Sequence, residues 1–131
     1  MTKSRIARIL LAGLDHKTAQ QITQELSTPN LIFDHEWHRF DVLHALELYK
    51  YDLIILDEHP DHLSCFRTCA EIRDDLRMND VPILVLTQEM SQTTVAAFEE
   101  IDVNLFIEKP VTHKELITVS RIIVSLSSSS L

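Results

Sequence analysis

Short apolar runs alternate with amphipathic stretches along the chain, and this alternation predicts its secondary structure. Five runs are predicted to be strands, because they are continuously apolar and too short for helices, and the first, third and fourth runs are predicted to be buried on both faces. The five runs lie at residues 6–12, 31–33, 53–56, 83–86 and 105–107. Between and after these runs, apolar residues recur at spacings of three and four, which indicates helices with one face in the core.

Each predicted helix has an apolar stripe that we expect to face the core. The stripes comprise Ala19, Ile22 and Leu26 in the first helix; Phe40, Leu43, Leu46 and either Leu48 or Tyr49 in the second; Phe66, Cys69, Ile72 and Leu76 in the third; Val95, Phe98 and Ile101 in the fourth; and Leu116, Val119, Ile122, Ile123 and Leu126 in the last. Ser91 is the predicted N-cap of the fourth helix.

The repeated order of strand and helix predicts an α/β fold. Right-handed crossovers and short connections give a five-stranded parallel sheet with helices on both faces. The strands lack the alternation of apolar and polar residues that antiparallel sheets show, which supports parallel pairing. We expect a single domain over residues 1–126, followed by a serine-rich tail or the start of a linker at 127–131.

Composition narrows the functional classes. The formal net charge of −8 argues against nucleic-acid binding by this domain. No apolar run approaches the roughly 18 residues that a membrane span needs, and the first apolar segment is too short for a signal peptide. We therefore expect a cytoplasmic protein with no membrane partner. Gly13 is the only glycine, which excludes the phosphate-binding loops that need two or three.

Three polar residues are predicted to follow strands directly: Asp57 after the third, Thr87 after the fourth and Lys109 after the fifth. Functional groups in parallel sheets gather at the carboxyl ends of the strands, so we expect all three at one edge. There a carboxylate could act as a nucleophile, an ammonium could neutralise added negative charge, and a hydroxyl could donate a hydrogen bond to it. Their joint placement carries this inference, since threonine commonly ends strands and Lys-Pro is a common turn.

With these segments in place, the chain resembles the receiver domain of two-component response regulators, from Arg5 to about Leu126. The similarity is carried by Tyr-Asp-Leu-Ile-Ile-Leu-Asp ending at Asp57, Val-Pro-Ile-Leu-Val-Leu-Thr ending at Thr87, and Phe-Ile-Glu-Lys-Pro ending at Pro110. The resemblance implies a (βα)5 flavodoxin-like, doubly wound fold. It also implies a role in phosphorelay signal transduction rather than as an independent enzyme.

The resemblance implies roles for individual residues. Asp57 would be the phosphoacceptor, and Thr87 would be the switch hydroxyl that contacts the phosphoryl group. Lys109 would pair with that group, ahead of a peptide bond to Pro110 that is usually cis in this family. Phe106 would be the aromatic switch residue, which turns inward when the hydroxyl moves. The implied partner is a histidine kinase or another signalling protein, and a homodimer is a further alternative.

The chain departs from the family at the metal site. Receivers carry an acidic pair at the end of the first strand, which holds Mg²⁺ beside the phosphoacceptor, whereas this chain has Ala12 and Gly13 there. Asp15 is the nearest carboxylate, but it lies one or two residues later and is an alternative cap for the first helix. With only Asp57 and Asp15 as candidate ligands, we expect weak Mg²⁺ binding and slow or absent phosphorylation, and hence an atypical receiver.

A non-phosphorylated alternative stays open beside the phosphorylated one. The domain would then be a pseudo-receiver, a constitutive protein–protein interaction or dimerisation module. In that case Asp57, Thr87 and Lys109 would persist as a structural hydrogen-bonded cluster, because removing one member of a buried ion pair strands the other. The missing acidic pair favours this alternative, and the presence of the three polar residues favours the phosphorylated one.

The cysteines and nearby histidines suggest one further site. His59, His62 and Cys65 follow Asp57 closely and could ligate Zn²⁺ or another transition metal. The competing interpretation is favoured, because loops collect polar residues and the chain has seven histidines. Cys65 and Cys69 are four residues apart on a predicted helix, so we interpret them as small buried hydrophobes in a reducing compartment rather than as a disulfide.

Overall fold

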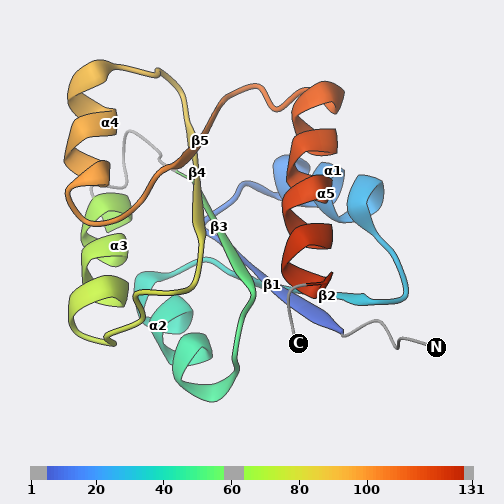
Figure 1. Ribbon diagram of the computed structural model, residues 1–131, viewed down its shortest axis with the longest axis horizontal. Helices are drawn as coiled ribbons and strands as arrows, with labels where there is room; N and C mark the ends of the chain where they lie inside the picture. The colour runs from blue at the N-terminus through green and yellow to red at the C-terminus, as the bar shows by residue number, and fades with distance from the viewer. Residues whose placement is uncertain (1–5, 58–63, 129–131) are drawn as a thin grey trace.

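A single five-stranded sheet organises the protein (Figure 1). The computed structural model describes residues 6–57 and 64–128. Its elements, in chain order, are β1 (Ala7–Ala12), α1 (His16–Leu26), β2 (Leu31–Glu36), α2 (Arg39–Leu48), β3 (Leu53–Asp57), α3 (Ser64–Asp74), β4 (Ile83–Thr87), α4 (Gln92–Glu99), β5 (Leu105–Glu108) and α5 (His113–Ser128). Every pair of neighbouring strands is parallel, and the strand order is β2-β1-β3-β4-β5. The predicted α/β fold is confirmed.

Helices cover both faces of the sheet, with α1 and α5 on one side and α2, α3 and α4 on the other (Figure 1). Strands β3 and β4 are buried at every position, since side chains on both faces meet helices. This burial explains why the two strands are continuously apolar in sequence. The chain reverses its direction of strand addition between β1 and β3, and α/β proteins form their sites at the carboxyl ends of strands at such a point.

The predicted inward face of α2 is confirmed at Leu46, which is buried, and at Leu43, which packs partly buried against the core, but it is wrong at the other predicted positions. Phe40 is 74% exposed, and Leu48 and Tyr49 also lie at the surface. The α2 residues buried in the core are Val42, Ala45 and Leu46. Apolar residues occur on both sides of this helix, so their spacing alone did not single out one stripe. Arginine side chains cover two of the outward rings, because the guanidinium carbon of Arg39 lies 4.7 Å from the Phe40 ring centroid and that of Arg8 lies 3.9 Å from the Tyr49 ring centroid.

Helix α3 is shorter than predicted, and its stripe is shifted at both ends. Cys69 and Ile72 are buried as expected, whereas Phe66 is 41% exposed and Cys65 is buried in its place. Leu76 lies beyond the end of the helix at Asp74. The following turn is held by the buried guanidinium of Arg73, which donates hydrogen bonds to the carbonyl oxygens of Met78, Val81 and Asp102.

The last two helices agree with the predicted stripes in their central residues. Phe98 is the buried residue of α4, and the Ser91 side chain accepts a hydrogen bond from the Thr94 N–H, which confirms the predicted N-cap. Ile101 lies past the end of α4. Leu116, Val119 and Ile123 of α5 are buried. Helix α5 continues to Ser128, into the first serines of the predicted tail. Within the described ranges, no helix has the length and apolar character that crossing a bilayer requires.

Candidate functional site

A buried ion pair between Asp57 and Lys109 forms the centre of the candidate site. Asp57 is the last residue of β3, and its side chain is 2% exposed. The Lys109 ammonium donates a hydrogen bond from Nζ to Asp57 Oδ1 at 2.6 Å, and its own side chain is 15% exposed. The two side chains come from segments 52 residues apart in sequence. A carboxylate this deeply buried requires a compensating cation, and Lys109 supplies it.

The segment after β5 places Lys109 at the sheet edge. Its backbone N–H donates to the carbonyl oxygen of Thr87 at 2.7 Å, which extends the β4–β5 pairing by one residue. The Lys109–Pro110 peptide bond is cis, as the family resemblance implied. Helix α1 supports the next residue, because the Gln21 side-chain amide donates to the carbonyl oxygen of Val111 at 3.1 Å.

Thr87 lies at the same edge but is engaged with its own loop. It ends β4 and is 2% exposed. Its hydroxyl donates to the carbonyl oxygen of Glu89 at 3.1 Å and accepts from the Glu89 N–H at 3.3 Å. Asp57 is in register with Leu86, so Thr87 lies one residue beyond it on the neighbouring strand. The structure thus brings Asp57 and Lys109 into contact and holds the Thr87 hydroxyl in a turn beside them.

Phe106 belongs to a row of three aromatic rings. It is paired with Val85 in the sheet and is half-buried. Its ring packs edge-on against Phe98 of α4 at 5.9 Å between centroids, and Phe98 packs in the same manner against Phe66 of α3 at 5.3 Å. The row connects β5 to the surface of α3 through α4. A movement of the Phe106 ring would therefore alter the ring packing on α4 and α3.

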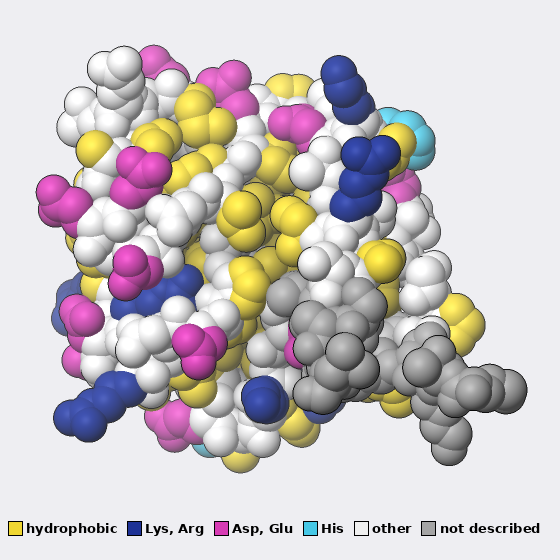
Figure 2. Space-filling model, viewed as in Figure 1, with side chains coloured by type: hydrophobic (Ala, Val, Ile, Leu, Met, Phe, Trp, Pro, Cys, Tyr) yellow, Lys and Arg dark blue, Asp and Glu magenta, His cyan; other side chains and the backbone are white. Residues whose placement is uncertain are grey.

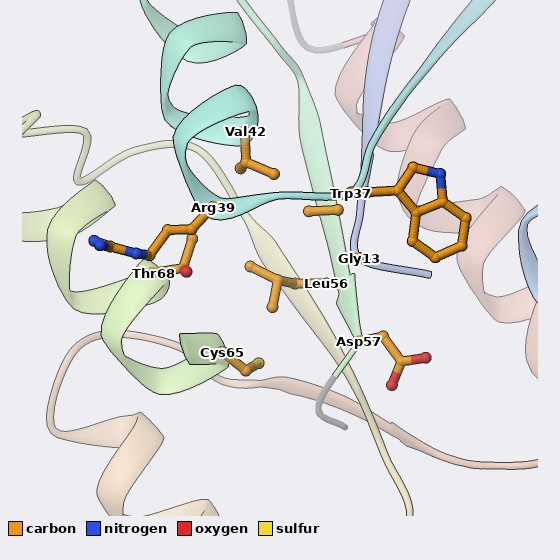
Figure 3. A pocket seen from close by; sticks show the side chains of 9 residues that line it. Gly13, Trp37, Arg39, Val42, Leu56, Asp57, Cys65 and Thr68 are labelled. Carbon is orange, nitrogen blue, oxygen red and sulfur yellow. The ribbon is translucent and has the colours of Figure 1, made fainter. Parts of the chain in front are cut away.

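A small pocket of about 30 Å³ opens beside Asp57 (Figure 3). It is lined by Ala12, Gly13, Trp37, Arg39, Val42, Leu56, Asp57, Cys65 and Thr68. Asp57 is the one carboxylate among these lining residues. In Figure 3 the Arg39 side chain extends away from Asp57 toward α3, where its guanidinium pairs with Glu71. Among the described residues, the pocket therefore offers a metal ion one carboxylate, and its other polar side chains include those of Arg39 and Thr68.

Asp15 is the N-cap of α1, which was one of the two roles that the sequence allowed for it. Its Oδ1 accepts from the Thr18 N–H at 2.8 Å, and its Oδ2 accepts from the Thr18 hydroxyl at 2.8 Å. The Thr18 N–H is also the main reason why the pKa of Asp15 is lowered. Both carboxylate oxygens are thus used within the first turn of the helix, which makes Asp15 a poor candidate for a second metal ligand.

The described residues fit Mg²⁺ poorly. Over residues 6–57 and 64–128, no group of three or more His, Cys, Asp or Glu side chains is arranged to hold a metal ion. Mg²⁺ requires near-octahedral oxygen ligands and usually one or two carboxylates. In the alternative transition-metal site, His59 and His62 lie outside the described residues. Cys65 is buried at the start of α3, and both cysteines are thiols rather than a disulfide.

Replacing Asp15 tests its role as a cap. Asp15→Ala is expected to lower the free energy of unfolding by about 1 kcal/mol at neutral pH, whereas Asp15→Asn keeps a capping oxygen and costs less. Because the folded-state pKa of Asp15 lies below its usual 3.8, the carboxylate's stabilisation is complete above that value and is lost as the pH falls through the folded-state pKa. Urea unfolding at neutral pH and at about pH 3 measures this, and a constant difference between Asp15→Ala and the unaltered chain would contradict it.

Several residues of the site escaped the sequence analysis. Trp37, in the segment between β2 and α2, and Thr68, in α3, line the Asp57 pocket. No local pattern marks them, because they reach the site only through folding. Glu108 lies inside the Phe-Ile-Glu-Lys-Pro segment that contains Lys109, and no sequence pattern distinguishes its carboxylate from that of an ordinary surface residue. Its side chain accepts a hydrogen bond from the Met90 N–H at 2.8 Å, which ties the end of β5 to the β4–α4 loop.

Comparison with known protein sequences gives matches over most of the chain. The family model for the Response regulator receiver domain matches residues 9–121. Among curated proteins, the chain is 36% identical over 84 residues to the autoinducer 2 sensor kinase/phosphatase LuxQ of Vibrio parahaemolyticus. That match covers 62% of this chain and 10% of the sensor kinase. The chain thus spans about a tenth of the length of the curated relatives it matches.

Solved structures share the fold. The receiver domain of the DNA binding response regulator merR from Colwellia psychrerythraea superposes with a TM-score of 0.79 at 20% identity, covering 91% of this chain and 98% of that one. Chemotaxis protein CheY4 of Vibrio cholerae gives a TM-score of 0.78 at 19% identity, with coverages of 89% and 98%. At these identities the likeness shows the fold, and the roles of individual residues rest on the site itself.

Proposed function

The chain belongs to the response regulator receiver domain family, and from this premise we propose that Asp57 is the phosphoacceptor of a two-component signalling switch. The observation that carries the proposal is the buried contact between Asp57 and Lys109, at 2.6 Å, where β3 ends at the centre of the sheet. This pair puts a nucleophilic carboxylate beside a fixed cation at the position where parallel sheets carry their chemistry.

The chemistry of the pair suits phosphoryl transfer. A carboxylate oxygen of Asp57 attacks phosphorus and forms an O–P bond, while the bond between phosphorus and the donor's leaving group breaks. Lys109 neutralises part of the negative charge that arrives with the phosphoryl group. Thr87 can donate a hydrogen bond to this group only after its hydroxyl leaves Glu89. The rearrangement would be read out by Phe106, whose ring already contacts α4 through Phe98.

We further propose that Mg²⁺ binds weakly and that phosphorylation of Asp57 is correspondingly slow. Ala12 and Gly13 stand at the end of β1 beside Asp57, and neither has a side chain that can bind a metal. Both carboxylate oxygens of Asp15 accept hydrogen bonds from Thr18. Metal ions supply much of the charge neutralisation in phosphoryl transfer, so the reaction here depends mainly on Lys109.

The proposed partners are other signalling proteins, and the proposed location is the cytoplasm. A histidine kinase or another signalling protein would supply the phosphoryl group, and the domain acts as a switch rather than as an independent enzyme. Figure 2 shows acidic side chains spread over the α3 and α4 side of the molecule, and the net charge is −8. This charge supports a protein partner over nucleic acid. The buried thiols Cys65 and Cys69 fit the reducing conditions of the cytoplasm.

Labelling with acetyl phosphate tests the proposed function. The full chain is incubated with acetyl phosphate and Mg²⁺, and intact-mass spectrometry follows the mass of one added phosphoryl group. We expect slow, partial labelling that is absent in Asp57→Asn, a variant of nearly the same size that lacks the nucleophilic charge.

Two other results would reject the proposal. Labelling that persists in Asp57→Asn would place the acceptor elsewhere. If the unaltered chain gains no mass with acetyl phosphate or with a histidine kinase, the domain is a phosphorylation-independent interaction or dimerisation module. Its oligomeric state would then be the next measurement, by sedimentation of the full chain.

A further inference from the structure

The last residue of β5 restrains the loop that carries Thr87. Glu108 is in register with Thr87, and its Oε2 accepts a hydrogen bond from the Met90 N–H at 2.8 Å. Met90 lies in the short loop between the end of β4 and the Ser91 N-cap of α4. A carboxylate that accepts from a backbone N–H makes a charge-assisted hydrogen bond, which is stronger than a neutral one.

The same loop holds the Thr87 hydroxyl. Its two hydrogen bonds to the backbone of Glu89 close a tight turn immediately before Met90. Glu108 therefore binds the loop at Met90, the residue that follows this turn. The adjacent residue of the same segment, Lys109, binds the Thr87 carbonyl oxygen through its N–H and Asp57 through its ammonium. Two consecutive residues thus make different contacts. Lys109 binds the Asp57 carboxylate, and Glu108 binds the β4–α4 loop at Met90.

We propose that Glu108 is a positioning residue that holds the β4–α4 loop with the Thr87 hydroxyl engaged by Glu89 rather than by the Asp57 site. The inference rests on the proposed function, because Thr87 has a phosphoryl group to contact only if Asp57 accepts one. Glu108 opposes the rearrangement, since the loop cannot carry Thr87 toward Asp57 without straining or breaking the Met90 hydrogen bond. The carboxylate sets the balance between the two arrangements of the loop.

The position of Glu108 on its strand explains how its effect would spread. Side chains alternate along a strand, so Glu108 and Phe106 share one face of β5. Phe106 contacts Phe98 of α4, and the loop gripped by Glu108 leads into α4. Release of the loop should therefore alter the surroundings of Thr87 and of Phe106 together.

Nuclear magnetic resonance of the full, unphosphorylated chain tests the proposal. Glu108→Ala is expected to speed hydrogen exchange at the Met90 amide about five- to tenfold, since one charge-assisted hydrogen bond is lost. It should also shift the Thr87 and Phe106 side-chain resonances. Glu108→Gln retains an acceptor oxygen and should restore most of the protection and the resonance positions. Glu89→Ala removes an equal charge from the same loop without removing the Met90 hydrogen bond, and should resemble the unaltered chain.

Two outcomes overturn the inference. If Glu108→Ala speeds exchange at Met90 but leaves the Thr87 and Phe106 resonances in place, the hydrogen bond is local and positions nothing. If Glu89→Ala matches Glu108→Ala, the effect comes from loop charge rather than from the Met90 contact. These measurements use no phosphodonor, so the acetyl phosphate experiment can fail while the loop restraint is observed, and the reverse can also occur.

Discussion

Lys109→Met is expected to lower the free energy of unfolding by about 3 kcal/mol, because it leaves the Asp57 carboxylate buried without its cation. Asp57 is 2% exposed, so water that reaches the carboxylate through the adjacent pocket would replace the lost ammonium only in part. Methionine keeps most of the unbranched length of the lysine stem, which limits the loss of packing. Urea unfolding at neutral pH measures the change.

Two further variants separate the ion pair from packing. Asp57→Asn should cost less than Lys109→Met, because the lysine stem is flexible and its 15% exposed side chain can carry the ammonium into water. The double variant with both substitutions should recover much of the loss, since no unpaired carboxylate is then buried. If Lys109→Met costs the same with and without Asp57→Asn, the two residues are not coupled and the site is not held together by this pair.

Gly13→Asp is expected to strengthen Mg²⁺ binding and to speed the labelling of Asp57 by acetyl phosphate about tenfold or more, because it restores a carboxylate to the pocket beside Asp57. The space around Gly13 admits a side chain. A Cβ added at Gly13 would meet its nearest neighbour, the carbonyl oxygen of Trp37, only at 4.0 Å. Gly13 has a φ of +71°, and aspartate tolerates that left-handed region better than most residues.

Gly13→Asn is the matched control. It places the same demand on the backbone and has nearly the same size, but it adds no charge. Trp37 lines the pocket and is 51% exposed, so its fluorescence can report a Mg²⁺ titration alongside the labelling rate. Equal responses from Gly13→Asp and Gly13→Asn, or no response from either, would show that a missing carboxylate at the end of β1 is not what limits the metal.

The fold follows closely from the sequence because the central strands leave little choice. Strands β3 and β4 are buried on both faces, and only continuous apolar runs can occupy such positions without stranding polar groups. Asp57 ends such a run, so its placement at the sheet edge was predictable. The buried face of helix α2 was harder to predict, since apolar side chains on both of its sides gave two candidate faces. The rings of Phe40 and Tyr49 face outward under arginine side chains, one of them supplied by Arg8 from β1.

The sequence by itself determined the order of strands and helices along the chain, the family, and which polar residues lie at the carboxyl edge of the sheet. Tertiary structure decided which of these groups are already paired. Asp57 and Lys109 are in contact, whereas the hydroxyl of Thr87 is bound to Glu89 and both oxygens of Asp15 are bound to Thr18. The reason is that periodicity fixes which face or edge a residue occupies, while a hydrogen bond depends on side-chain rotamers and on segments far apart in sequence.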